Sequence, residues 1–162
     1  MKIAALLATA GGIGRIPFAP GTWGTLPALP IAWAAHWAGG INALVFVTAI
    51  TFALGWWATG VYLDGREEDP KEVVIDEVAG MLLTLWPLSW GLSMSQVEPH
   101  VFPWPGWVGG FLLFRFFDIV KPPPVNWADR PGPLGVMLDD MVAGAMAGAL
   151  MLLAAGIAHG WF

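Results

Sequence analysis

Long apolar stretches separated by short polar ones dominate this chain. Residues 16–63, between Arg15 and Asp64, are 48 consecutive positions without a charged side chain. A helix needs about 20 residues to cross the hydrocarbon core of a bilayer, so this stretch is long enough for two passes. The expected break is Gly39–Gly40, because paired glycines favour a change of backbone direction.

The same pattern predicts three further helices. The polar loop DGREEDPKE (64–72) ends the second span, Pro87 bends or ends the third, and Pro122 stops the fourth. A mixed polar and apolar stretch, 91–105, is expected to be a loop. The expected spans are 24–38, 41–63, 72–86, 106–120 and 135–158. The first is short, and the sequence leaves open whether it crosses fully or re-enters.

Composition places these helices in a membrane. The chain is 57% hydrophobic and 12% charged, with a mean hydropathy of +0.65, whereas soluble domains carry about 25% charged residues. We therefore expect an all-α fold, a polytopic helical membrane bundle of about four to five spans, with one domain over residues 1–162. The first residues, MKIAALLATAGG, have some features of a signal peptide, but their basic region is one lysine and further spans follow.

Missing residue types exclude several functions. The absence of cysteine excludes disulfides, cysteine-ligated metals and a cysteine nucleophile. Basic residues form no patch that would bind nucleic acid.

The basic residues predict the orientation, since cytoplasmic loops of membrane proteins are enriched in Lys and Arg. If the N-terminus is cytoplasmic, all seven lie on the cytoplasmic side: Lys2, Arg15, Arg66, Lys71, Arg115, Lys121 and Arg130. Five tryptophans then fit an aromatic belt at the opposite interface: Trp86, Trp90, Trp104, Trp107 and Trp161.

Five acids lie inside the predicted helices, near the cytoplasmic end. Asp76 and Glu77 begin the third span, Asp118 lies near the end of the fourth, and Asp139 and Asp140 lie in the first turns of the fifth. A charge within a membrane helix costs about 2.5–3.5 kcal/mol, and a helix N-terminus offsets only about 0.3–1 kcal/mol. A divalent cation would supply the missing charge, and oxygen-only ligands favour Mg²⁺ or Mn²⁺. The alternative is a set of acids solvated among lipid headgroups.

Two similar segments carry these acid pairs. In IDEVAG (75–80) and LDDMVAG (138–144), carboxylates are followed by small residues that end in Gly80 and Gly144. Small residues allow helices to approach closely in lipid. We therefore expect the third and fifth spans to pack together with their acids facing each other.

Two further segments supply groups for an anion. In FRFFDIVKPPP (114–124), the spacing predicts an Arg115–Asp118 ion pair and leaves Lys121 free to reach a ligand. In GRIPFAPGTWGT (14–25), Gly21 and Thr22 could seat an anion at a helix start, although a plain helix start explains this segment better. Together with the acids, these groups fit chemistry on a phosphate carried by a lipid headgroup.

Four stretches in this order resemble the phosphatidylglycerophosphatase A family of bacterial inner-membrane lipid phosphatases: PGTWGTLPALP (20–30), VVIDEVAGM (73–81), FRFFDIVKPPPVNWADR (114–130) and GVMLDDMVAGAMAG (135–148). The resemblance covers residues from about Leu6 to Ala155. It implies Mg²⁺-dependent removal of the terminal phosphate from phosphatidylglycerophosphate, a step of phospholipid biosynthesis that gives phosphatidylglycerol and phosphate. It places the enzyme in the bilayer with its active site at the cytoplasmic interface.

We expect catalysis from the four acids of the two pairs, which would also hold Mg²⁺: Asp76, Glu77, Asp139 and Asp140. Asp118 either joins the metal ligands or orients Arg115. Arg115 and Lys121 would bind phosphate, with Gly21 and Thr22 seating it. Arg15 and Arg130 are weaker candidates for headgroup contact, and Trp23 and Trp127 are expected to anchor the interface.

Several alternatives are disfavoured. The three histidines, His36, His100 and His159, map to the far side, which argues against a phosphohistidine intermediate. The DxDxT motif of aspartyl-phosphate enzymes is absent, which argues against that mechanism too. Attack by metal-activated water is therefore the leading mechanism, ahead of attack by a carboxylate. The residue spacing of CDP-alcohol phosphotransferases is absent. A membrane transporter or channel component with a carboxylate cation site is the main rival, but such sites lie near the bilayer midplane. The oligomeric state is open.

Overall fold

The computed structural model describes residues 2–64 and 70–159, and every regular element in these ranges is a helix. The elements are α1 (Lys2–Ala8), the 3-10 helix η1 (Ala10–Arg15), α2 (Pro20–Thr25), α3 (Ala28–Leu63), α4 (Ile75–Thr84), α5 (Trp86–Met94), α6 (Trp104–Val120), α7 (Val125–Ala128) and α8 (Pro133–Ala158). The all-α prediction is confirmed.

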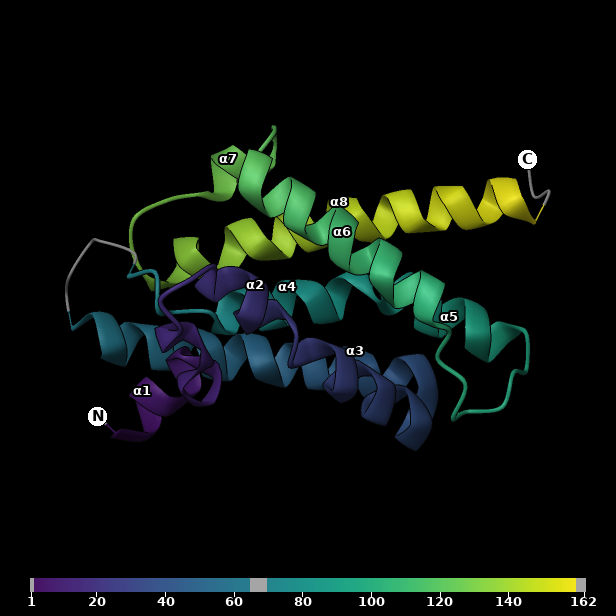
Figure 1. The fold of residues 1–162 in the computed structure, drawn as a ribbon, viewed down its shortest axis with the longest axis horizontal. Coiled ribbons are helices and arrows are strands. Elements are labelled where there is room, and N and C mark those ends of the chain that lie inside the picture. Colours follow the sequence, from purple (N-terminus) through teal and green to yellow (C-terminus); the bar gives the residue numbers. More distant parts are fainter. Residues whose placement is uncertain (1, 65–69, 160–162) are drawn as a thin grey trace.

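The break predicted at Gly39–Gly40 is present inside α3. Gly40 has φ 60° and ψ −146°, and Gly39 is also non-helical. Residues with a side chain rarely adopt this backbone conformation, so glycine is needed here. At this point the chain turns and runs back along the molecule to Leu63, as Figure 1 shows. The first two expected spans therefore form a helical hairpin.

The next predicted break, at Pro87, is also confirmed, but the loop after it is shorter than expected. Helix α4 ends at Thr84 and α5 begins at Trp86, with Pro87 in its first turn. Proline is tolerated in a first turn, where its missing N–H breaks no helical hydrogen bond. Residues 91–94, expected to be loop, continue α5, and α6 begins at Trp104.

Among the described residues, two helical stretches are long and apolar enough to cross a membrane, by length and composition. They are Pro20–Leu63, which contains the Gly39–Gly40 break, and Pro133–Ala158. The expectation of four to five spans is not confirmed by this criterion. The third expected span is divided between α4 and α5, with 10 and 9 residues, and α6 has 17 residues.

Helices α4 and α8 cross at Gly80 and Gly144, as their similar sequences predicted. A Cβ atom on Gly80 would lie 2.5 Å from the carbonyl oxygen of Asp140, and one on Gly144 would lie 2.3 Å from that of Gly80. Any side chain there would force the helices apart. The hydroxyl of Thr84 donates to the carbonyl oxygen of Gly80 (3.0 Å) and lies 3.4 Å from that of Gly144. This crossing brings the two acid pairs together.

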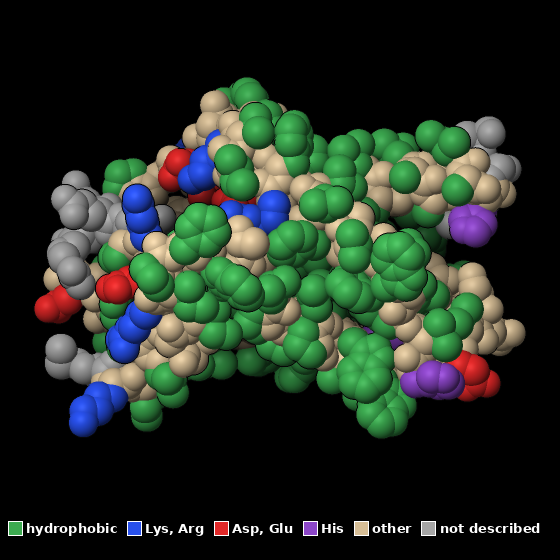
Figure 2. Space-filling view, viewed as in Figure 1, with side chains coloured by type: hydrophobic (Ala, Val, Ile, Leu, Met, Phe, Trp, Pro, Cys, Tyr) green, Lys and Arg blue, Asp and Glu red, His purple; other side chains and the backbone are tan. Residues whose placement is uncertain are grey.

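Basic side chains gather toward one end of the molecule. Figure 2 shows the described Lys and Arg in the half that contains the N-terminus and α7, apolar side chains over the middle, and the histidines toward the other end. His36 is buried there, with its Nδ1 hydrogen-bonded to the hydroxyl of Ser89 (2.8 Å). The histidines lie toward the end opposite the basic residues, as predicted.

The tryptophans of the predicted belt differ in exposure. Trp90 and Trp104 are exposed, but Trp86 is half-buried and its indole N–H donates to the hydroxyl of Thr48 (3.0 Å). Trp161 lies outside the described residues.

Candidate active site

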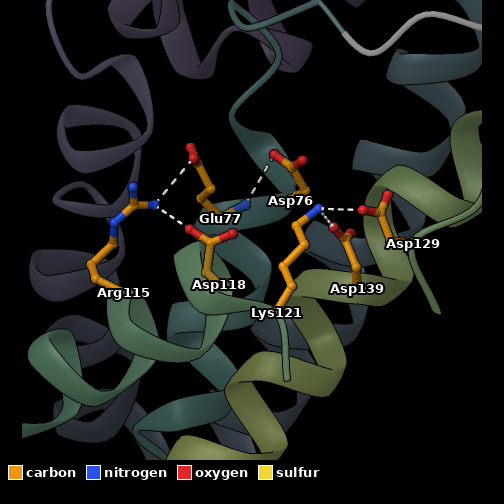
Figure 3. A network of polar contacts seen from close by, with 7 residues as sticks. All are labelled: Asp76, Glu77, Arg115, Asp118, Lys121, Asp129 and Asp139. Atoms are coloured by element: carbon orange, nitrogen blue, oxygen red, sulfur yellow. Dashed lines mark hydrogen bonds and ion pairs between the residues drawn. The ribbon is translucent and has the colours of Figure 1, made fainter. Parts of the chain in front are cut away.

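Five carboxylates from three helices meet beside the α4–α8 crossing. Helix α4 contributes Asp76 and Glu77, α6 contributes Asp118, and α8 contributes Asp139 and Asp140. Figure 3 shows four of them turned toward the same region. Asp140 is buried within electrostatic range of the other four. The predicted convergence of the acids is therefore present in the fold.

The start of α4 stabilises its own acid pair. Asp76 and Glu77 lie in the first turn, where helix N–H groups and the helix dipole favour negative charge. A carboxylate oxygen of Asp76 accepts a hydrogen bond from the backbone N–H of Glu77 (3.0 Å). Val74 directly precedes the first residue of α4, and its backbone N–H donates to the carbonyl oxygen of Ala8 in α1 (2.9 Å). The N-terminal helix thus fixes where α4 begins.

Glu77, Arg115 and Asp118 form an ion-pair group, here called the Arg115 cluster. Nη1 of Arg115 lies 3.3 Å from Oε1 of Glu77 and 2.5 Å from Oδ2 of Asp118. The predicted Arg115–Asp118 pair is confirmed, and Glu77 is an additional partner from α4. Asp118 sits in the last turn of α6, where the helix dipole opposes a negative charge. The guanidinium therefore offsets this unfavourable placement and links α6 to α4.

Lys121, Asp129 and Asp139 form a second group, the Lys121 cluster. Nζ of Lys121 lies 2.7 Å from Oδ2 of Asp139 and 2.8 Å from Oδ2 of Asp129. The expectation that Lys121 is free was wrong. Lys121 ends α6 in a left-handed conformation (φ 46°), so its side chain leaves the helix face shared by Arg115 and Asp118. Burial opposes its charge, but hydrogen bonds to the two aspartates outweigh this and raise the pKa of Lys121.

Asp129 was missed by the sequence reasoning. It follows the short helix α7, eight residues after Lys121, and no local helical spacing connects the two. The chain path around the short α7 helix brings the pair together, and Figure 3 shows the resulting contact between Lys121 and Asp129. Its position directly before Arg130 in a stretch rich in proline and charge was the one available signal.

Negative charge exceeds positive charge in this part of the molecule. Arg115 and Lys121 face six carboxylates: Asp76, Glu77, Asp118, Asp129, Asp139 and Asp140. Oδ1 of Asp139 and Oδ2 of Asp140 are buried, and neither accepts a hydrogen bond within the described residues. Buried carboxylate oxygens without partners are costly. The site therefore has capacity for a further cation.

The donor set suits a hard divalent ion, because it consists of carboxylate oxygens without cysteine or nearby histidine. Within the described residues, however, no three acidic or histidine side chains are placed as ligands of one ion. Figure 3 shows the guanidinium of Arg115 beside Glu77 and Asp118, and the ammonium of Lys121 beside Asp139 and Asp129. The residues are of the types that bind magnesium. To hold one ion together, their side chains would have to turn away from these two cations.

Gly21 lies against the Arg115 cluster. A Cβ atom there would be 2.0 Å from Oε1 of Glu77 and 3.0 Å from Nη1 of Arg115, so a larger residue would displace the ends of these two side chains. The hydroxyl of Thr25 donates to the carbonyl oxygen of Gly21 (2.8 Å) within this short helix. Thr22 is half-buried on the same helix. The segment thus begins a helix, as its sequence favoured, and also borders the site.

The weaker headgroup candidates are not members of either cluster. Arg15 is exposed at the end of η1 and interacts with Tyr62 of α3. Arg130 follows Asp129, and its Nε donates to the carbonyl oxygen of Trp127 (3.1 Å). Trp127 and Trp23 are both exposed, as interface anchors would be.

Comparison with known proteins gives one family. The family model for phosphatidylglycerophosphatase A matches residues 6–155. Phosphatidylglycerophosphatase A of Escherichia coli K12 is 32% identical, with 96% of this chain and 84% of the relative covered. The Haemophilus influenzae protein of the same name is also 32% identical, covering 88% and 82%.

A third relative carries a different name. A Bacteroides thetaiotaomicron protein, provisionally named as a phosphatidylinositol-3-phosphatase, is 37% identical over 92% of this chain and 91% of its own length. No solved structure matches the chain.

Proposed function

Because the chain belongs to the phosphatidylglycerophosphatase A family, we propose that it hydrolyses the terminal phosphate monoester of phosphatidylglycerophosphate. Water attacks phosphorus, the ester P–O bond breaks, and the products are phosphatidylglycerol and inorganic phosphate. The observation that carries this proposal is the meeting of buried carboxylates with Arg115 and Lys121 at one end of an otherwise apolar surface. A site with this composition at the end of an apolar surface suits a phosphate monoester in a lipid headgroup.

Arg115 and Lys121 bind the phosphate oxygens in this proposal. Arg115 Nη1 lies close to Gly21, so a phosphate held by the guanidinium would also meet α2, where Gly21 and Thr22 border it. Lys121 is only partly buried and can reach an incoming anion. Positive groups aimed at the phosphate stabilise the charge that develops on its oxygens during the reaction.

A magnesium ion would be held by Asp76, Glu77, Asp118, Asp139 and Asp140. The two buried carboxylate oxygens without partners, on Asp139 and Asp140, support this assignment. When bound, such an ion supplies positive charge for the phosphate and an activated water. One carboxylate of the two acid pairs accepts the proton of the attacking water, and the leaving alkoxide takes up a proton to become the hydroxyl of phosphatidylglycerol.

The enzyme would work in the bacterial inner membrane with its N-terminus and active site facing the cytoplasm. The gathering of Lys and Arg at one end of the molecule supports this orientation. Large apolar side chains exposed along α3, α6 and α8, among them Phe46, Leu112 and Leu153, support contact with lipid. In this arrangement α4–α5 and α6 also cross, which completes the four to five spans.

A phosphate-release assay with a panel of lipids tests the proposal. Purified protein in mixed micelles with Mg²⁺ should release phosphate from phosphatidylglycerophosphate faster than from phosphatidic acid or phosphatidylinositol 3-phosphate, and EDTA should abolish the release. Preference for phosphatidylinositol 3-phosphate would move the assignment to the activity in the name of the Bacteroides relative. Cation flux into liposomes without phosphatase activity would instead favour the transporter alternative.

Asp140→Asn provides the mutational arm of this test. Loss of a metal-holding carboxylate should lower turnover by about a hundredfold or more, beyond the effect typical of outer-shell partners. Thermal stability in detergent should be unchanged or higher, because one of five crowded negative charges is removed. Glu98→Gln, an equal loss of charge on an exposed residue between α5 and α6, is the control and should retain full activity. Near-normal turnover of Asp140→Asn would remove Asp140 from the mechanism.

A further inference from the structure

A cavity of about 430 Å³ lies between α7 and the first turns of α8. Its walls include Pro124 and Trp127 on one side and Leu134, Gly135 and Leu138 on the other, and Arg130 is its one charged lining residue. The volume falls within the range of ligand pockets. The phosphate and metal roles proposed above make no use of this cavity.

Arg130 is an exposed side chain at this cavity, and it has no acidic partner in the part of the chain that the structure describes. Its Nε donates to the carbonyl oxygen of Trp127 (3.1 Å), which anchors the guanidinium, and no carboxylate of the described residues pairs with it. Its backbone rests directly on α8, because a Cβ atom on Gly135 would lie 1.8 Å from the carbonyl oxygen of Arg130. The cavity therefore presents a positioned positive charge to a ligand.

The cavity adjoins the Lys121 cluster. Gly135 in its wall and Asp139 in that cluster are four residues apart, about 6 Å along one face of α8. On the other side, Asp129 precedes Arg130 and binds Lys121. Lys121 at the end of α6 and Arg130 after α7 thus both lie beside the first turns of α8. This arrangement suits a ligand with two linked negative groups.

We propose that this cavity binds the phosphodiester and the adjoining ester-linked glycerol of the lipid substrate, with Arg130 pairing with the diester. The inference rests on the proposed function, in which the substrate carries a terminal monoester and a diester joined by a three-carbon bridge. With the monoester at Lys121, the diester would reach the adjoining cavity, because Asp129, which pairs with Lys121, directly precedes Arg130. Trp127, Leu134 and Leu138 are exposed and apolar, so they suit the part of the lipid that enters the bilayer.

The test separates the two phosphate positions with two inhibitors. Phosphatidylglycerol carries the diester without the monoester, and inorganic phosphate resembles the monoester alone. Arg130→Gln should raise the KM for phosphatidylglycerophosphate and weaken inhibition by phosphatidylglycerol, each by about tenfold, the effect of losing one charged hydrogen bond. Turnover at saturation and inhibition by inorganic phosphate should be unchanged. Arg130→Lys should restore part of the loss, and Lys2→Gln, an exposed cation on α1, should match the wild type.

Three results would overturn the proposal. Unchanged KM and unchanged phosphatidylglycerol inhibition in Arg130→Gln would show that the cavity does not bind the diester. An equal loss of inhibition by inorganic phosphate would place Arg130 at the monoester instead. Equilibrium binding of radiolabelled phosphatidylglycerol to the purified protein needs no turnover, so it tests the cavity even if the wild type fails to hydrolyse phosphatidylglycerophosphate. Equal binding by the wild type and Arg130→Gln would refute the assignment.

Discussion

The Arg115 cluster and the Lys121 cluster each contain one cation between two acids, but they differ in depth. In the Arg115 cluster the side chains of Arg115, Glu77 and Asp118 are 15%, 13% and 14% exposed. In the Lys121 cluster, Lys121 is 33% exposed and Asp129 is 51% exposed, and only Asp139, at 9%, is deeply placed. The same kind of ion-pair group therefore occurs once inside the helix bundle and once at its edge.

This difference in depth indicates that the two clusters have different roles, one mainly in stability and the other mainly in ligand binding. Charges interact more strongly where water is scarce, and a buried charge that loses its partner is costly. Arg115 joins α4 to α6 through two acids that have little access to water, so it serves the fold as well as the phosphate. Lys121 has a solvent-exposed partner, and exposed ion pairs contribute only about 0–1 kcal/mol. Its ammonium can therefore move from Asp129 to a ligand at small cost.

Of the variants in the two clusters, Arg115→Gln should have the largest effect on stability and activity. It leaves Glu77 and Asp118 without their cation, and the free energy of unfolding in detergent should fall by about 2–3 kcal/mol, somewhat less than for a fully buried pair. Phosphate release should fall to background, because a phosphate ligand is lost as well. Arg115→Lys should recover little, since one ammonium does not reproduce the planar guanidinium.

The double variant Arg115→Gln/Asp118→Asn separates charge from packing. Removing one stranded carboxylate should return about half of the lost stability while activity stays at background. If the double variant is less stable than Arg115→Gln alone, the uncompensated charge is not the source of the cost.

The sequence predicted the parts of this architecture that depend on local pattern. Paired glycines at 39–40 and the proline at 87 placed two breaks correctly, because backbone preferences of Gly and Pro act within one or two residues. The repeated acid-plus-small-residue segments predicted the crossing at Gly80 and Gly144, because close helix approach needs small residues at the contact.

The missed features depend on the chain path. Helical spacing placed Lys121 on the face of Arg115 and Asp118, but its left-handed conformation directs it to Asp139 on α8. Asp129 reaches Lys121 only because α7 folds back toward α8, and no periodicity in the sequence records that. The number of membrane spans stays a prediction, because the third expected span is divided between α4 and α5, and each of these helices is too short to cross a membrane alone.

Lys121→Gln should lower activity with little effect on the fold. The loss of one charged hydrogen bond to the phosphate should lower kcat/KM by about 10- to 100-fold. The free energy of unfolding should fall by less than for Arg115→Gln, because only one of the two acids left without Lys121, Asp139, is buried. Steady-state kinetics and thermal unfolding of the same preparation measure both quantities. Lys71→Gln, an exposed lysine before α4, is the matched control. A loss of stability as large as that of Arg115→Gln would show that depth does not separate the two clusters.

Asp129→Asn should have the smallest effect and the opposite sign. Asp129 competes with the substrate phosphate for Lys121 and adds a negative charge near the place where that phosphate binds. Its removal should therefore lower the KM about two- to fivefold, equivalent to at most about 1 kcal/mol for an exposed pair. Because the charge is exposed, the difference from the wild type should shrink as ionic strength rises. A KM that increases at all salt concentrations would mean that Asp129 holds Lys121 in its productive position, and the edge cluster would then be as fixed as the buried one.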